Sequence, residues 1–129
     1  MMPEVNDSSV PTNELAQKLI TFVDEAGLKV VSHINGQANA AKLGIDVEAD
    51  QVIEVFHPKY AVKVWRAAHC AGIDIPLRFH IFEENGMSKF SFRKPSMVFA
   101  PYQNEELSKI GSELDSLFLN IACRIRELG

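Results

Sequence analysis

The chain has 129 residues and a mass of 14.4 kDa, the size of one domain that can bury a single core. Hydrophobic residues make up 47% and charged residues 23%, a balance that argues against a disordered chain. The net charge of −4 argues against a function driven by attraction to nucleic-acid phosphates, although a local basic patch on such a protein still suits a small anion.

No apolar run approaches the roughly 18 to 20 residues that a membrane-spanning helix needs. The N-terminal stretch MMPEVNDSSVPTNE is polar, so we expect no signal peptide. Cys70 and Cys123 lack CxxC spacing and are too few for a disulfide scaffold. We interpret them as two buried, inert thiols and predict a cytoplasmic protein.

In chain order, residues 1–11 are predicted to be a loose N-terminal arm, or a short edge strand through Val10, ahead of one domain at residues 12–129. Thr12 is the expected N-cap of a first helix, and Gly27 its stop. A strand follows over residues 28–34, and then a short alanine-rich helical turn over residues 37–43.

The stretch DVEAD at residues 46–50 lacks the central glycine and closing glutamate of a calcium loop, so we predict an acidic loop. A strand over residues 51–56 leads to Pro58, which suits the first position of a helix that ends near Ala71. The side chains expected on its buried stripe are those of Ala61, Val64, Trp65 and Ala68.

After a hairpin at residues 77–95, the segment SMVFAP is predicted to add a short strand. A long final helix covers residues 104–128, because its apolar residues recur at spacings of three and four. Short strands, a hairpin and separate helices together predict an α+β domain of two layers whose sheet is at least partly antiparallel.

The most legible stretch is LRFHIFEENGMSKFSFRKP, in which Asn85-Gly86 predicts a type I′ hairpin turn. Counting back from this turn gives the register, since side chains alternate between the faces of a strand. The predicted core-facing pairs are Ile81 with Phe90 and Phe79 with Phe92. The predicted pairs on the other face are Phe82 with Lys89, His80 with Ser91, and Arg78 with Arg93.

Two arginines directly across a strand pair repel each other unless an anion, a carboxylate or water lies between them. The same alternation on the other strands predicts an open sheet face whose candidate site residues are Arg78, His80, Arg93, Glu54, His33, Phe56 and Phe82. Three interpretations remain open: a solvated face, a subunit interface, or a ligand site in which Arg78 and Arg93 hold a carboxylate or phosphate.

Metal binding and catalysis have weaker support in the sequence than the three interpretations above. His33, Glu54 and His80 come from separate strands without HxH or HExxH spacing, so we expect no metal site. No glycine-rich phosphate loop, GxSxG elbow or nucleotide-binding fingerprint is present in the sequence, and we assign no catalytic residue and no cofactor.

Several motifs resemble those of one family when they are taken in order. The chain carries EVFHPKYA, then GIDIPLRFHIFEENG, then RKPSMV, and these resemble the bacterial and archaeal domain of unknown function 302 family, also called TT-seventeen-fifty-one-like. The resemblance spans about residues 12–101. It implies a curved, mostly antiparallel sheet with helices on one face, similar to the TATA-binding-protein-like class, and members that are often dimeric.

The resemblance implies no established activity and transfers no catalytic residue. His57 and Leu77 depart from its pattern, which has asparagine and cysteine there in many members, so a thiol-based role is not expected. The leading hypothesis is a non-catalytic homodimeric module that binds a small anionic ligand or a protein partner on the open sheet face. The alternatives are an enzyme with a His/Glu acid–base pair, His80 or His33 beside Glu54, and a purely structural dimerisation domain.

Overall fold

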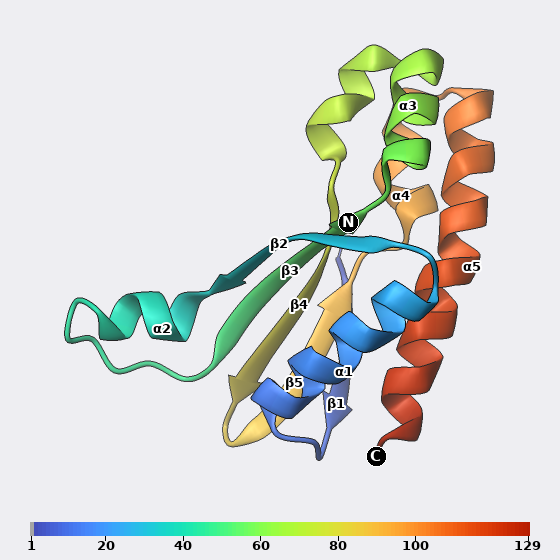
Figure 1. The fold of residues 1–129 in the computed structure, drawn as a ribbon. Helices are drawn as coiled ribbons and strands as arrows, with labels where there is room; N and C mark the ends of the chain where they lie inside the picture. Colours follow the sequence, from blue (N-terminus) through green and yellow to red (C-terminus); the bar gives the residue numbers. More distant parts are fainter. Residues whose placement is uncertain (1) are drawn as a thin grey trace.

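In the computed structural model, which describes residues 2–129, the chain forms one five-stranded antiparallel sheet with helices packed on one face (Figure 1). The elements in chain order are β1 (Glu4–Ser8), α1 (Thr12–Glu25), β2 (Lys29–Asn35), α2 (Gly36–Ala41), β3 (Asp50–Phe56), α3 (Pro58–Ala67), the 3₁₀ helix η1 (His69–Asp74), β4 (Leu77–Glu84), β5 (Met87–Phe92), α4 (Pro95–Phe99), the 3₁₀ helix η2 (Ala100–Tyr102) and α5 (Glu105–Glu127).

The strand order is β1-β5-β4-β3-β2, so the hairpin of β4 and β5 lies in the middle of the sheet. The sheet is curved, and α2 projects beyond the ends of β2 and β3, away from the helical layer (Figure 1). The predicted two-layer α+β fold with a curved antiparallel sheet is confirmed, while the TATA-binding-protein-like label stays a prediction.

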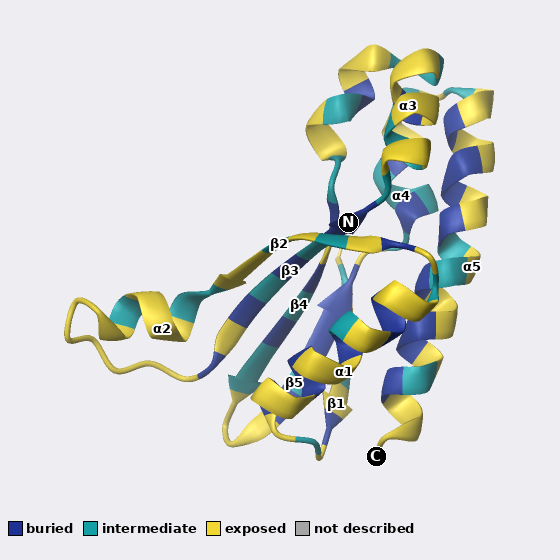
Figure 2. Ribbon diagram, viewed as in Figure 1, coloured by how far each residue is buried: buried dark blue, intermediate teal, exposed yellow. Residues whose placement is uncertain are grey.

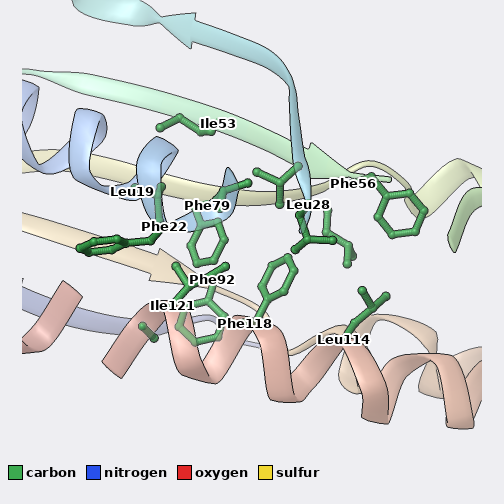
Figure 3. Close-up of a cluster of buried hydrophobic side chains, with 14 of the residues drawn as sticks. Leu19, Phe22, Leu28, Ile53, Phe56, Phe79, Phe92, Leu114, Phe118 and Ile121 are labelled. Atoms are coloured by element: carbon green, nitrogen blue, oxygen red, sulfur yellow. The ribbon is translucent and has the colours of Figure 1, made fainter. Parts of the chain in front are cut away.

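The core lies between the sheet and the helices, and the long helix α5 runs across it (Figures 2 and 3). Phe79 stacks on Phe118 of α5 with ring centroids 4.8 Å apart, and Phe92 packs against both rings. Each buried aromatic side chain removes a large apolar surface from water, which is the main force that holds the helical layer on the sheet.

The predicted hairpin is confirmed in its turn and in four of its five predicted pairs. Asn85 and Gly86 have φ values of 53° and 77°, as a type I′ turn requires. The pairs Ile81↔Phe90, Phe79↔Phe92, Phe82↔Lys89 and His80↔Ser91 all occur in the ladder.

The N-terminal segment is predicted to be either a loose arm or an edge strand. Residues 4–8 form the edge strand β1, which pairs with β5. It ends at Ser8 and does not reach Val10. Met1 lies outside the described residues. The N-cap of α1 is Pro11 and not Thr12, which is the first helical residue.

Two further element predictions are wrong. The helix after Pro58 ends at Ala67, because Ala68 has extended backbone angles and the chain continues as η1. On this shorter helix Val64 is buried, but the side chain of Trp65 is 47% exposed.

The segment SMVFAP is helical and not a strand. Pro95 occupies the first turn of α4, and Asp115 of α5 accepts hydrogen bonds from the backbone N–H of Ser96 at 2.9 Å and from its hydroxyl at 2.5 Å. A carboxylate from a neighbouring helix thus supplies the N-terminal acceptor that the local sequence lacks.

Both cysteines are exposed, which corrects the prediction of buried thiols. Cys70 lies in η1, and Cys123 lies on a face of α5 where its Sγ is 3.5 Å from Oε1 of Glu127. Among the described residues, no helix is both long enough and apolar enough to cross a membrane.

Candidate functional site

The sheet register places several of the predicted site residues side by side on the face that the helices leave uncovered. Glu54 pairs with Arg78, and Val52 pairs with His80, across β3 and β4. Directly opposed residues of an antiparallel pair point to the same face, and their neighbours Ile53 and Phe79 are fully buried in the core. The open face, as we use the term, is this helix-free side of the five strands.

The expected arginine pair is replaced by an ion pair. The last pair of the β4–β5 ladder is Phe79↔Phe92, so Arg93 lies just beyond the end of β5 and the predicted pair of Arg78 with Arg93 is not part of the ladder. Instead, Nη2 of Arg78 donates to Oε2 of Glu54 at 3.3 Å. A carboxylate from the adjacent strand therefore removes the repulsion that the sequence suggested.

His33 does not lie on the open face, which corrects its prediction as a site residue there. The register of β2 against β3 shifts between Val30 and Ser32, and this β-bulge places His33 opposite the buried Ile53. Its Nε2 lies 2.6 Å from Oε1 of Gln51, a buried side chain that in turn donates to Asn13 of α1.

The two phenylalanines predicted for the open face differ in their placement. Phe56 is the last residue of β3, where the chain turns into α3, and it is only 4% exposed because it belongs to the core beside Tyr60. Phe82 pairs with Lys89 on the open face and stacks on His80, with ring centroids 4.5 Å apart.

Asp50 is a partner of His80 that the sequence did not reveal. Both of its carboxylate oxygens lie 3.0 Å from Nε2 of His80. The alternation of side chains contains the signal, since Asp50 stands two residues before Val52 and faces the same way. The prediction of a loop over residues 46–50 is wrong at Asp50, which is the first residue of β3.

The predicted acid–base arrangement of a histidine beside Glu54 is therefore replaced by other partners. His80 contacts Asp50, Glu54 contacts Arg78, and His33 lies on the opposite face. Within residues 2–129, no group of three His, Cys, Asp or Glu side chains is placed to hold a metal ion.

One end of the open face is hollowed. This hollow has a volume of about 630 Å³, and its lining residues are Pro3, Val52, Ile73, Asp74, Pro76, Leu77, Arg78, His80, Ser91, Phe92, Arg93, Val98 and Pro101. Three of the predicted site residues, Arg78, His80 and Arg93, thus line one space. Its size falls within the range of small-molecule sites.

The rim of the hollow is closed by η1 and η2, which a side-chain hydrogen bond joins. The hydroxyl of Tyr102 donates to Oδ2 of Asp74, and this bond raises the pKa of Tyr102 to about 12 because the carboxylate stabilises the neutral phenol. This rim could not be predicted from the sequence, because short 3₁₀ segments have no hydrophobic periodicity that would identify them.

The fold has a close structural relative. The crystal structure of an uncharacterised conserved DUF302 protein from Bacillus stearothermophilus superimposes with a TM-score of 0.86 at 21% sequence identity, over 97% of this chain and 98% of that one. The sequence model of the family described as Domain of unknown function DUF302 matches residues 5–122. No curated protein matches the chain.

Proposed function

We propose that this chain, which belongs to the Domain of unknown function DUF302 family, binds a small anionic molecule in the hollow and carries out no chemistry of its own. The observation that carries the proposal is the presence of Arg78 and Arg93 on the walls of one hollow of about 630 Å³. Guanidinium groups match the geometry of carboxylate and phosphate oxygens. In a concave site they can contact a bound anion from more than one side.

The exposure of Arg78 and the geometry of its ion pair support a role in anion binding. Its side chain is 63% exposed, and its bond to Glu54 uses Nη2. A guanidinium group has further N–H donors in a fixed planar arrangement, so an anion can bind to Arg78 without breaking this ion pair.

Titration of the purified protein with sodium acetate and with inorganic phosphate, at constant ionic strength, tests the proposal. We expect changes in the NMR amide shifts of Arg78, Arg93 and their neighbours. The double variant Arg78→Ala/Arg93→Ala is expected to lower the affinity by about tenfold or more, because charge-assisted hydrogen bonds are lost. Lys18→Ala, which removes an exposed charge on α1, should leave the affinity unchanged. Equal binding by the double variant contradicts the proposal.

A homodimer is the second part of the proposal. Val5 and Ile34, which pair with Ser91 and Val52 on the open face, are 53% and 46% exposed. These two side chains lie on the two edge strands of the open face, with Phe82 of β4 between them, and a second copy that covers this face would bury all three. Ile34→Asp is expected to shift the protein to monomers in sedimentation velocity, whereas Val62→Asp, on α3, is not; a monomeric wild type at high concentration contradicts this part.

If the homodimer forms but neither anion binds, the purely structural dimerisation domain is the better description. We keep the cytoplasmic location within the proposal, because two exposed thiols without a disulfide suit a reducing compartment.

A further inference from the structure

Most of the hollow is apolar, which an inorganic anion would not require. Its apolar lining residues are Pro3, Val52, Ile73, Pro76, Leu77, Phe92, Val98 and Pro101. The charged groups are Arg78 and Arg93 on the strand side and Asp74 on the rim. A site with this division suits a molecule that has one anionic end and an apolar body.

Ile73 gives the most direct indication. Its side chain is 86% exposed, although it lies in η1, which the bond from Tyr102 to Asp74 holds against η2. A large apolar side chain on a fixed rim loses unfavourable contact with water when an apolar group covers it. An occupant of the hollow would provide that cover.

The balance of charge favours an occupant with a single negative charge. Arg78 and Arg93 bring two positive charges to the hollow, and two carboxylates, those of Asp74 on the rim and of Glu54 beside Arg78, bring two negative charges. His80 is paired with Asp50, and that pair adds no net positive charge in either protonation state of the imidazole. An occupant with two negative charges would therefore meet more repulsion from these carboxylates than one with a single carboxylate, whose geometry the guanidinium groups still match.

We propose that the ligand of the hollow is an amphipathic monocarboxylate, whose carboxylate lies at Arg78 and Arg93 and whose apolar body lies against Ile73, Val98 and Pro101. This inference rests on the proposed function, because it names the class of anion that the same site takes. It makes the apolar part of the ligand, and not its charge alone, the source of affinity.

Calorimetric titration of the full chain with acetate, hexanoate and hexanamide tests the proposal. We expect hexanoate to bind about tenfold or more tightly than acetate, because its alkyl chain is partly buried at roughly 0.8 kcal/mol for each fully buried methylene, and about 1.4 kcal/mol corresponds to a factor of ten. Hexanamide has the same body without the charge, and it should bind at least about tenfold more weakly than hexanoate.

Two exposed apolar residues provide a matched pair of variants. Ile73→Ser is expected to lower the affinity for hexanoate by about threefold to tenfold and to leave that for acetate unchanged. Leu43→Ser, at a site that is 78% exposed between α2 and β3, should change neither affinity. Thermal unfolding of both variants checks that the fold is intact.

The outcomes separate this inference from the proposed function. Equal affinities for acetate and hexanoate, both lost in Arg78→Ala, overturn the amphipathic ligand and leave an anion site. Binding of neither compound, or binding that Arg78→Ala leaves intact, overturns both. A preference for hexanoate that Ile73→Ser does not reduce places the alkyl chain elsewhere and also contradicts the inference.

Discussion

Arg78 and Glu54, which lie directly across from each other on β4 and β3, form an ion pair with Nη2 and Oε2 3.3 Å apart. The arginine side chain is 63% exposed and the glutamate side chain 20% exposed. Because solvent screens a pair of this kind, it is a poor source of stability. Its position on the wall of the hollow indicates that it orients the guanidinium group of Arg78.

The first prediction concerns this pair. We expect Arg78→Ala to lower the free energy of unfolding by no more than about 1 kcal/mol, because exposed ion pairs contribute roughly 0–1 kcal/mol. Urea denaturation of Arg78→Ala, Glu54→Ala and the double variant gives the coupling energy. A coupling well above 1 kcal/mol would show that the pair is structural, and the binding experiments would then need Arg78→Lys.

The second prediction concerns the close contact between α4 and α5. A Cβ atom at Gly111 would lie 2.7 Å from Cα of Ser96, and Asp115 holds Ser96 in place. Overpacking costs about 1–3 kcal/mol, whereas alanine gains about 1 kcal/mol over glycine in a helix. We therefore expect Gly111→Ala to destabilise the protein by up to about 2 kcal/mol net in denaturant unfolding.

The matched control for that variant is Ser112→Ala, one residue further along α5 at an exposed position. It should stabilise the protein by a few tenths of a kcal/mol, because alanine has a higher helix propensity than serine. A stabilising effect of Gly111→Ala would mean that α4 moves away from α5 at little cost.

The third prediction concerns pH. The pKa of Tyr102 is raised to about 12 from the usual 10.0, chiefly by its hydrogen bond to Asp74. Since the folded-state pKa is the higher one, the stabilising effect of this bond is fully present below pH 10 and is lost as the pH rises towards 12. The ultraviolet absorbance of tyrosinate should show Tyr102 ionising near the upper end of this range.

Two variants assign that titration. Asp74→Asn is expected to move the pKa of Tyr102 back towards its usual value, and Tyr102→Phe should remove its transition altogether. The pKa of Tyr60 is also raised, first by burial and then by Glu113, so the signal that remains in Tyr102→Phe belongs to Tyr60. Wild-type ionisation of both phenols near pH 10 would contradict the prediction.

The fourth prediction concerns the thiols. Because Cys70 and Cys123 are both exposed, we expect both to react with a thiol reagent in the folded protein without denaturant. Cys70→Ser and Cys123→Ser should each remove one equivalent of reaction. If the thiols react only after unfolding, the original interpretation of buried cysteines is restored.

The sequence by itself determined those features that depend on neighbours along the chain. Asn85-Gly86 set a tight turn, and from that turn the alternation of side chains specified the pairs of the hairpin as far as Phe79 with Phe92, because a two-residue loop leaves no freedom of register. The apolar spacing of the last helix likewise placed it on the core, since burial of one stripe of side chains follows from the helical period.

The tertiary structure decided what local rules leave open. A one-residue bulge in β2 turned His33 to the other face, and the turn into α3 buried Phe56, because strand alternation fails wherever the ladder is interrupted. At the rim of the hollow η1 and η2 are joined by the hydrogen bond between Tyr102 and Asp74, which are 28 residues apart in the sequence. Contacts between such distant residues depend on the packing of the whole chain, which no local pattern records.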